Sequence, residues 1–336
     1  MNFFRKILFP FSLLYGLITS VRNYLYQINV FKSTKFKVPT IVVGNLSVGG
    51  TGKTPQIEYL IRLLQSNYKI AVLSRGYKRK SKGFIIADKN SSSEVIGDEP
   101  FQYYKKFPNI IVCVDADRTN AIQKLETLEN PPDIVLLDDA FQHRKVQGGF
   151  NILLTSYQNL YVNDSMLPTG NLREHRSGAK RAQVIIVTKC PNTISEAEQL
   201  EIKNRLKPNL NQQVFFTAIE YDNELKGSST LNLLELVNKE IILLTGIANP
   251  APLTDYLKSL NIKFKHLKYP DHYNFKKHEV EKINALTLDN NNCVITTEKD
   301  YVRIFAGLQN LRYISIQTKF VAKSTSFDKL INKYVE

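Results

Sequence analysis

The sequence has few of the residues that build disulfide frameworks, redox pairs or zinc sites. It holds three cysteines in 336 residues, Cys113, Cys190 and Cys293, and they lie far apart. None has the spacing of a metal knuckle or of a redox pair. Two of them fall in apolar runs and the third follows one, which is typical of reduced thiols in or near the core of a cytosolic protein.

A hydrophobic run long enough to cross a bilayer is also missing at the N-terminus. The run ILFPFSLLYGLITS covers residues 7–20, whereas a spanning helix needs about 20 apolar residues. Arg5, Lys6 and Arg22 flank it, and no acidic residue occurs before Glu58. No small-x-small cleavage site follows, which argues against a signal peptide. Two alternatives remain: a helix lying in the membrane interface, which the basic flanks favour, and a buried helix of the core.

The composition lacks the bias of a disordered chain, since 43% of the residues are hydrophobic and 23% are charged. The length exceeds what one core usually supports, so we expect two domains. The formal net charge of +14 is compatible with nucleic acid, an anionic membrane or a phosphorylated substrate. The basic clusters do not alternate clearly with aromatic residues, so no nucleic-acid partner is predicted.

Short apolar runs alternate with amphipathic segments through the first two thirds of the chain. The runs are PTIVV (39–43), IAVLS (70–74), IIVCV (110–114), DIVLLD (133–138), NILLT (151–155) and QVIIVT (183–188). This pattern predicts a parallel sheet covered by helices on both faces, an α/β doubly wound domain.

A polar passage, YDNELKGSST at 221–230, interrupts the pattern and marks the best domain boundary. After it come IILLT (241–245), KFKHLKY (263–269), CVITT (293–297) and YISIQ (313–317). We therefore expect an N-terminal membrane-associated helix at 1–30, a core domain at 31–225 and a smaller C-terminal α/β domain at 226–336.

The stretch VGNLSVGGTGKTP, residues 43–55, resembles a phosphate-binding loop without its first glycine, because Ser47 stands at that position. A predicted strand leads into it, and a helix begins near Lys53 and Thr54. Glycines at this turn leave backbone N–H groups free to face oxyanions at the positive end of the helix. Lys53 is placed to reach the β- and γ-phosphates of a nucleotide and Thr54 to ligate magnesium. The predicted nucleotide-binding residues are Ser47, Val48, Gly49, Gly50, Thr51, Gly52, Lys53 and Thr54.

The run DIVLLDDAFQH supplies a second half for this site. Its buried strand ends at Asp138, whose carboxylate is expected beside the phosphate-binding loop, where Mg²⁺ or its water lies. Asp139 follows it directly. Switch ATPases, GTPases and kinases all share these features, so the acceptor of the phosphate stays open.

Further charged clusters follow other predicted strands, at the edge where ligand sites of open α/β sheets gather. Arg75 in SRGYKRK and Arg118 in VDADR are candidates for binding a phosphate or another anion. Asp98 in IGDEP is a candidate base toward a hydroxyl acceptor, with a helix cap as the alternative. The turn-rich segment LPTGNLREHRSG (167–178) is a candidate loop for substrate or metal. In the second domain, His272 stands beside Asp271 in YPDHYNF, where a carboxylate can orient a histidine base.

Taken together, eight motifs in order resemble the tetraacyldisaccharide 4′-kinase family. They are VGNLSVGGTGKTP, SRGY, GDEP, DADR, LLDDAFQHR, LPTGNLRE, PDHYNF and TEKD, and they extend to about Arg303. The resemblance implies an enzyme that phosphorylates the 4′-hydroxyl of a lipid-linked disaccharide 1-phosphate in lipid A biosynthesis. It also implies ATP and Mg²⁺, a P-loop NTPase-like core, and a location on the cytoplasmic face of the inner membrane, on an anionic surface.

The resemblance also assigns roles to individual residues. Lys53 and Thr54 would hold ATP and Mg²⁺, with Asp138, Asp139 and Glu174 near the metal. Asp98 would act as the base and His272 would pair with it as a closing second domain covers the first. Arg173 and Asn171 would contact substrate or phosphate. The predicted catalytic set is Asp98, His272, Lys53 and Asp139, the metal set is Thr54, Asp138 and Glu174, and the substrate set is Arg75, Arg118, Asn171 and Arg173.

The main alternative is a membrane-recruited switch ATPase with a deviant phosphate-binding loop. Such ATPases carry a signature lysine just before the two glycines, where this chain has Val48. A switch ATPase would act through a protein complex, whereas the kinase interpretation predicts no obligate protein partner.

Overall fold

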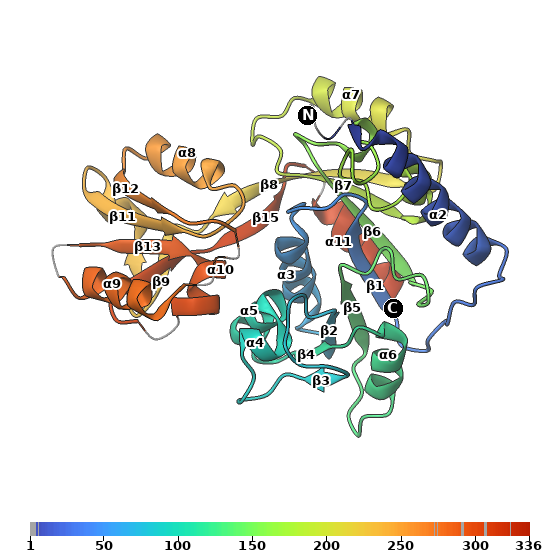
Figure 1. Ribbon diagram of the computed structural model, residues 1–336, viewed down its shortest axis with the longest axis horizontal. Coiled ribbons are helices and arrows are strands. Elements are labelled where there is room, and N and C mark those ends of the chain that lie inside the picture. Colours follow the sequence, from blue (N-terminus) through green and yellow to red (C-terminus); the bar gives the residue numbers. More distant parts are fainter. Residues whose placement is uncertain are drawn as a thin grey trace. The chain divides into compact units, whose positions relative to one another are not determined.

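The computed structural model describes residues 5, 7–271, 273, 275–289, 292–305, 308–322 and 324–336. The chain divides into two compact units: unit 1 holds Met1–Ile219 and Thr318–Glu336, and unit 2 holds Glu220–Gln317. In each unit, helices pack on a mostly parallel sheet (Figure 1). The α/β class predicted from the alternating apolar runs is therefore confirmed.

The sheet of unit 1 has nine strands in the order β15-β8-β7-β6-β1-β5-β2-β4-β3. In chain order these are β1 (Thr40–Asn45), β2 (Ile70–Ser74), β3 (Ile85–Ile86), β4 (Ile111–Val114), β5 (Ile134–Asp138), β6 (Phe150–Ser156), β7 (Val184–Thr188), β8 (Gln213–Tyr221) and β15 (Ile316–Phe320). Strands β1, β2, β4, β5, β6, β7 and β8 pair in parallel, and the short β3 pairs antiparallel with β4.

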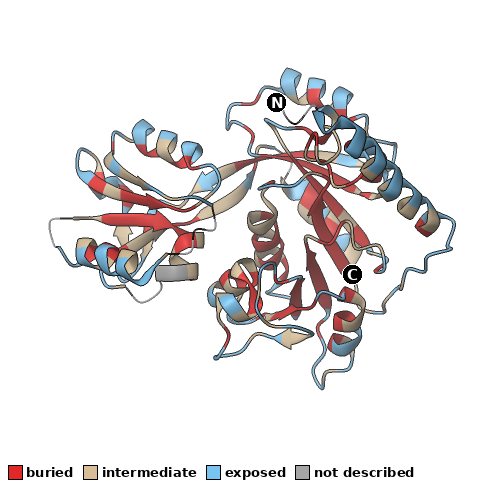
Figure 2. Cartoon of the chain, viewed as in Figure 1, coloured by how far each residue is buried: buried red, intermediate tan, exposed pale blue. Residues whose placement is uncertain are grey.

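Helices cover both faces of this sheet, which explains why its strands read as continuous apolar runs. Along β1, Ile41 and Val43 belong to one core cluster and Val42 belongs to the other, because successive side chains alternate between faces. The first cluster includes residues of α3 (Lys53–Leu64), α5 (Asp98–Lys106) and α11 (Ser324–Val335), and the second includes residues of α6 (Arg118–Glu126) and α7 (Glu196–Leu206). The short helix α4 (Ser93–Ile96) precedes α5. The strands are largely buried (Figure 2).

Strand β1 lies between β5 and β6, where the order of the parallel strands changes direction. The chain leaves β1 through α3 toward β2 on one side, and β6 and β7 lie on the other. Ligands of open α/β sheets bind at the carboxyl ends of strands at such a position. The ends of β1 at Asn45 and of β5 at Asp138 therefore mark where a site is expected.

Unit 2 contains a six-stranded sheet in the order β10-β9-β14-β13-β11-β12. Its strands are β9 (Glu224–Gly227), β10 (Leu231–Asn232), β11 (Glu240–Thr245), β12 (Lys263–Lys268), β13 (Val294–Thr297) and β14 (Leu311–Ile314). Helix α8 (Ala251–Ser259) packs in one core cluster and α9 (Lys277–Leu288) in another, on opposite faces of the sheet. The short α10 (Glu298–Asp300) follows β13 directly.

The C-terminal segment differs from the expected domain bounds. The predicted strand at 313–317 is two strands, β14 in the sheet of unit 2 and β15 in the sheet of unit 1. After β15, helix α11 packs in the core of unit 1, where Phe327 and Ile331 are fully buried. Residues 318–336 thus return to the first unit, because the apolar face of α11 is covered there.

The N-terminal run forms helix α2 (Phe9–Gln27), but most of its apolar side chains are exposed. Leu13, Leu14, Leu17 and Ile18 each keep more than half of their surface in solvent, at 57–61%. The helix is therefore not a core helix, which was one of the two expected alternatives. Among the described residues, no helix combines the length and the apolar content that a membrane crossing needs.

Candidate active site

The turn between β1 and α3 is shaped by two glycines and by one short bridge. Gly49 and Gly52 have φ of +108° and +86°, values that disfavour other residues. Ser47 instead forms an antiparallel bridge with Leu172, so this position is extended and needs no glycine. The missing first glycine of the motif is explained by that bridge. The neighbouring Val48 N–H donates to the Asn171 carbonyl at 2.8 Å, which removes this N–H from the predicted phosphate donors.

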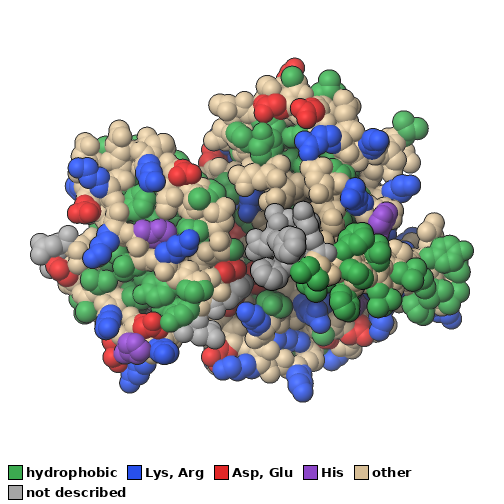
Figure 3. All heavy atoms as spheres, turned by 45° about the horizontal axis from the view of Figure 1, so that its top comes forward, with side chains coloured by type: hydrophobic (Ala, Val, Ile, Leu, Met, Phe, Trp, Pro, Cys, Tyr) green, Lys and Arg blue, Asp and Glu red, His purple; other side chains and the backbone are tan. Residues whose placement is uncertain are grey.

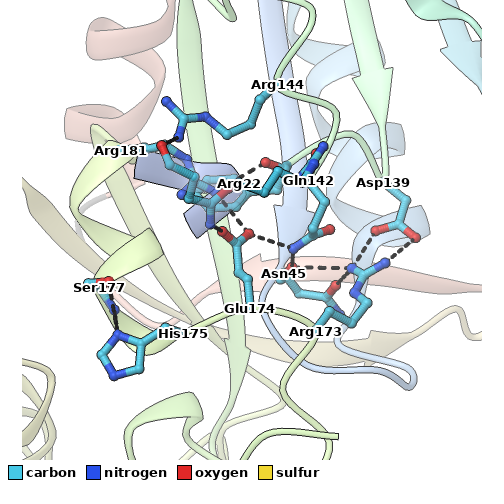
Figure 4. A network of polar contacts seen from close by, with 12 residues as sticks. Arg22, Asn45, Asp139, Gln142, Arg144, Arg173, Glu174, His175, Ser177 and Arg181 are labelled. Carbon is cyan, nitrogen blue, oxygen red and sulfur yellow. Dashed lines mark hydrogen bonds and ion pairs between the residues drawn. The ribbon is translucent and has the colours of Figure 1, made fainter. Parts of the chain in front are cut away.

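Asn45, at the end of β1, holds the turn from inside. Its side-chain amide donates to Thr51 Oγ1 at 2.7 Å, and both groups are buried. Its carbonyl oxygen accepts a hydrogen bond from Gln142, and its side-chain oxygen accepts one from the Arg173 guanidinium (Figure 4). Sequence reasoning did not select Asn45. A polar side chain ending an otherwise apolar strand was the signal that could have found it.

Asp138 ends β5 and is only 6% exposed. Ser74 donates to its Oδ2 at 2.9 Å, and the Tyr103 hydroxyl lies 3.5 Å from the same oxygen. Its Oδ1 is buried without a hydrogen-bond partner among the described residues. Burial, with a smaller contribution from the charge of Asp139, raises the pKa of Asp138 to about 6. An orphaned oxygen on such a carboxylate fits a bound cation.

The pKa of Asp139 is shifted in the opposite direction. Burial acts to raise its pKa, but hydrogen bonds and charge from Arg173, together with the charge of Lys53, hold the pKa below the ordinary value. Arg173 donates to both carboxylate oxygens, at 2.7 and 3.1 Å, and Lys53 Nζ lies 3.8 Å from Oδ1. Two neighbouring carboxyl groups are thus pushed apart in pKa, a pattern typical of catalytic sites. Lys53, Asp139 and Arg173 come together as predicted for one site.

Helix α5, which packs on the same face of the sheet as α3, also reaches this place. Its buried Tyr103 contacts Asp138, and the negative charge of Glu99 acts on the same carboxyl group. The helix begins at Asp98, which is half-buried, and the preceding Gly97 has φ of +97°. The first turn of α5, with Asp98 and Glu99, therefore lies on the Asp138 side of unit 1. Glu99 and Tyr103 were not predicted, although Glu99 stands in the selected motif.

Of the two predicted phosphate-binding arginines, Arg118 lies near the two aspartates and Arg75 lies near Arg118. Arg118 is only 4% exposed, and burial, followed by the charge of Arg75, lowers its pKa to about 10. Asp138 and Asp139 act on it in the opposite direction. The exposed Arg75 lines a groove of about 380 Å³. The other residues of that groove are Gly76, Tyr77, Lys78, Arg79, Ser81, Lys82, Gly83 and Ala116.

The hydrogen bonds of Glu174 do not match its predicted role as a metal ligand. Its Oε1 accepts from Gln142 at 2.9 Å and from Arg181 at 2.8 Å (Figure 4). Its Oε2 accepts from Asn23 of α2 at 2.8 Å. With both oxygens of this 3% exposed side chain occupied, its contacts support attachment of α2 rather than metal binding.

Asn171 also differs from expectation. Its side chain donates to Asp164 at 3.1 Å and accepts from Arg5, so it shapes its own loop. Its predicted substrate contact therefore has no support in these hydrogen bonds.

His272 lies outside the described residues, so its predicted catalytic role stays a prediction. Its neighbour Asp271 forms an ion pair with Lys299 at 3.9 Å within unit 2. Among the residues that the structure describes, no group of three or more His, Cys, Asp or Glu side chains is arranged to hold a metal.

Comparison with known families decides which phosphoryl-transfer class this site serves. The profile of the family described as Tetraacyldisaccharide-1-P 4′-kinase matches residues 4–336. The chain belongs to this kinase family.

Relatives and a solved structure agree with the family across the whole chain. The tetraacyldisaccharide 4′-kinases of Flavobacterium johnsoniae and Flavobacterium psychrophilum are 53% and 55% identical, over 100% of this chain and 98% of each relative. The crystal structure of LpxK from Aquifex aeolicus in complex with ATP has a TM-score of 0.80 and 32% identity, and the match covers 99% of this chain and 100% of that one.

Membership of the tetraacyldisaccharide-1-P 4′-kinase family confirms the enzyme class that the eight motifs predicted, an ATP-dependent kinase. It also settles the choice between the kinase and the switch ATPase, which the resemblance of residues 43–55 to a phosphate-binding loop left open. The lysine that switch ATPases place before the two glycines is replaced here by a half-exposed valine, Val48.

Proposed function

We propose that this kinase transfers the γ-phosphate of ATP to the 4′-hydroxyl of the tetraacyldisaccharide 1-phosphate precursor of lipid A. The family and its relatives carry the acceptor in their names, and the Aquifex aeolicus structure contains ATP. The observation that carries the proposal is the meeting of three features in unit 1: a glycine turn at a helix start, the carboxylate Asp138 with an open oxygen, and the acidic first turn of α5.

The phosphates of ATP would lie on the turn at 49–54. The first N–H groups of α3 have no side-chain cap, so they suit a phosphate at the positive end of the helix. Lys53 is held near Asp139 at 3.8 Å and supplies the positive charge expected beside the γ-phosphate. Thr54 and the orphaned Oδ1 of Asp138 are the groups that would hold Mg²⁺. When bound, Mg²⁺ neutralises charge on the β- and γ-phosphates.

Asp98 is proposed as the base that takes the proton from the sugar hydroxyl. A carboxylate near neutral pH would accept this proton as the bond between the sugar oxygen and the γ-phosphorus forms and the bond between that phosphorus and ADP breaks. Most of the rate enhancement comes from alignment and charge stabilisation. The fixed pair of Asp139 and Arg173 keeps one guanidinium at the site without moving during the reaction.

The anionic end of the substrate would use the two arginines. Arg118 is buried with its Nε unpaired among the described residues, and Arg75 is exposed in the basic groove. A guanidinium binds a phosphate through two parallel hydrogen bonds, which suits the 1-phosphate of the precursor. Arg173, by contrast, is committed to Asp139 and Asn45.

Helix α2 is proposed to lie on the cytoplasmic face of the inner membrane. Hydrophobic side chains gather over it in the space-filling view (Figure 3). Phe11, Leu13, Leu17 and Ile18 are 58–63% exposed. The polar side of the helix contacts the loop after β6: the Ser12 hydroxyl donates to Thr169 at 2.6 Å. Lysines 32, 35 and 37 follow the helix and are exposed, which favours anionic lipid headgroups.

Transfer of label tests the chemistry. With γ-labelled ATP and the lipid acceptor in mixed micelles, the wild-type protein should move label into chloroform-soluble product. Asp98→Ala should reduce that rate on the order of 10³-fold, as loss of a general base does, and should bind ATP normally. Glu94→Gln, four residues earlier and exposed, is the matched control. Unchanged turnover of Asp98→Ala would remove Asp98 from the base role.

Vesicle flotation tests the membrane surface. The wild-type protein should float with vesicles containing phosphatidylglycerol and much less with phosphatidylcholine alone. Leu14→Ser with Leu17→Ser should abolish flotation, because each loses about 2 kcal/mol of apolar burial in the lipid. Leu210→Ser, a fully exposed leucine elsewhere in unit 1, should float like the wild type. Equal flotation of all three proteins would place the membrane contact elsewhere.

A further inference from the structure

The end of strand β7 contacts the turn at 49–54, here named the phosphate turn because ATP is proposed to bind there. Thr188, the last residue of β7, points its hydroxyl at the Thr51 carbonyl at 2.8 Å. The next residue, Lys189, donates from its Nζ to the Gly50 carbonyl at 2.6 Å. Two consecutive carbonyl groups of the turn are thus bound by two consecutive residues of another strand.

The backbone of Lys189 is unusual in a way that suits a functional contact. Its φ is +58°, in the left-handed region, which disfavours a lysine by roughly 1 kcal/mol relative to glycine. A glycine would relieve that conformation but would bring no side chain to the turn. The lysine is exposed as a residue, yet its amine is directed to Gly50 rather than into solvent.

The direction of the bound carbonyls has a consequence for phosphate binding. In a trans peptide unit the N–H points away from the carbonyl of the same unit. Holding the Thr51 carbonyl toward Thr188 therefore turns the Gly52 N–H to the other side, where α3 begins. A carbonyl that faced a phosphate would repel it, and Lys189 keeps the Gly50 oxygen occupied.

The charge of Lys189 points to the same ligand. Partial burial against the turn, followed by the charge of Lys53, lowers the pKa of Lys189. Two ammonium groups that act on each other at one turn are accommodated best by an anion that contacts both of them. The residue before the two glycines of the turn is Val48, so no lysine approaches the phosphates from that position. Lys189 approaches the turn from a different strand.

We propose that Thr188 and Lys189 are positioning residues that clamp the phosphate turn for ATP, with Lys189 adding positive charge beside its phosphates. This inference rests on the proposed placement of ATP on the turn at 49–54. It extends that proposal, because it assigns a role in ATP binding to the end of β7.

Calorimetric titration of Mg·ATP into the full-length protein tests the clamp. Lys189→Met should weaken ATP binding roughly tenfold, because a charge-assisted hydrogen bond is lost. Lys189→Gly should weaken it equally, although glycine fits the left-handed backbone better, and Lys189→Arg should recover most of the affinity. Thr188→Val should weaken it about threefold. Lys180→Met, an exposed lysine of the same unit, should stay within about twofold of the wild type.

Two further readouts separate positioning from general stability. The KM for ATP should rise in Lys189→Met while the KM for the lipid acceptor stays within about twofold. The melting temperature without ligand should stay unchanged, and the increase that ATP produces should shrink. A variant that melts earlier without ATP and keeps its ATP affinity would overturn the clamp.

Lys53→Met distinguishes this proposal from the one on which it rests. If Lys53→Met loses ATP binding and Lys189→Met binds like the wild type, the clamp is wrong and the phosphate turn stands. If neither variant changes ATP binding, the phosphates lie elsewhere and both proposals fail. Loss in both variants supports both.

Discussion

Two buried aspartates, one in each unit, differ in how many hydrogen-bond partners their carboxylates have. Asp138 follows the apolar part of β5 in unit 1, and Asp300 lies in α10 directly after β13 in unit 2. Both are nearly inaccessible, at 6% and 0% exposure. Asp300 Oδ2 accepts from the Gly246 N–H and the Thr297 hydroxyl, both at 2.8 Å, and Arg303 donates to its Oδ1 at 3.1 Å. Asp138 has an oxygen with no partner among the described residues.

Both carboxylates are buried, so burial does not distinguish the two aspartates. What distinguishes them is whether each carboxylate oxygen has a hydrogen-bond partner. A fully bonded carboxylate fixes the backbone around it, as Asp300 fixes the turn after β11. A carboxylate with an open oxygen destabilises the fold that contains it, and it persists where a ligand completes it. Substitutions at these two positions should therefore have opposite effects on stability and activity.

The largest effect is expected for Asp138→Asn. The amide keeps the shape but not the charge, so phosphoryl transfer should fall on the order of 10³-fold. Without ligand the variant should melt at the same temperature or higher. The raised pKa of about 6 means that folding disfavours the charged form of Asp138, by up to about 3 kcal/mol at neutral pH. Label transfer and thermal melting measure the two effects. An inactive variant that is also less stable would break the comparison.

Asp300→Ala should have the opposite profile. Removing the carboxylate leaves the Gly246 N–H and the Arg303 guanidinium buried without their partner, which costs about 3 kcal/mol of unfolding free energy. Urea unfolding of the full-length chain, followed by hydrogen exchange of unit 2, measures it. ATP affinity should stay within about twofold, because the turn at 49–54, where the phosphates of ATP are proposed to bind, belongs to unit 1. Asp289→Ala, at the exposed end of α9, is the control.

Glu174 sharpens the comparison, because it is a satisfied carboxylate in the functional unit. Glu174→Gln should lower stability by about 1–2 kcal/mol, since the charged bond from Arg181 is lost. Helix α2 should become more sensitive to limited proteolysis, because Asn23 also binds this carboxylate. The dependence of activity on Mg²⁺ concentration should not change. A clear shift in that dependence would return Glu174 to the metal role predicted from the sequence.

The sequence predicted most of the strands because buried parallel strands are apolar on both faces. All six apolar runs before residue 190 correspond to strands β1, β2, β4, β5, β6 and β7. It did not predict that YISIQ supplies strands to two sheets. That division depends on where the apolar face of α11 is covered, and periodicity carries no information about the covering partner.

For the site, the sequence located Lys53 at the start of α3 and Asp138 at the end of β5, and their roles toward ATP and Mg²⁺ stay predictions. It could not show which side chains would be occupied by partners elsewhere in the fold. Glu174 and Asn171 stand in a charged, turn-rich motif, yet Arg181, Asn23 and Asp164 occupy their polar atoms. Lys189 was visible only as a lysine after a strand. Lys189 follows β7 and Gly50 follows β1, and β6 lies between these two strands in the sheet. The contact between Lys189 and Gly50 therefore depends on the strand order.

The smallest effect expected extends the comparison from carboxylates to a histidine. His143, in the loop after β5, has its Nε2 buried without a hydrogen-bond partner among the described residues. Burial, with the charge of Arg118, lowers its pKa from 6.5 to about 4. Between these two pH values His143 is protonated in the unfolded chain and neutral in the folded chain. The two states then differ by up to about one bound proton. The stability that this group contributes is therefore complete above pH 6.5 and is lost as the pH falls toward 4.

His143→Gln should remove that part of the pH dependence. The urea midpoint of the wild type should fall between about pH 7 and pH 4.5 more steeply than that of the variant, with the largest gap at the acid end. His278→Gln, in the first turn of α9, is the matched control and should follow the wild type. Parallel curves for wild type and His143→Gln would mean that this imidazole finds a proton acceptor in the fold. A buried polar atom without a hydrogen-bond partner would then not be enough to shift the pKa of the group that carries it. The explanation given for the raised pKa of Asp138 would be weakened in the same way.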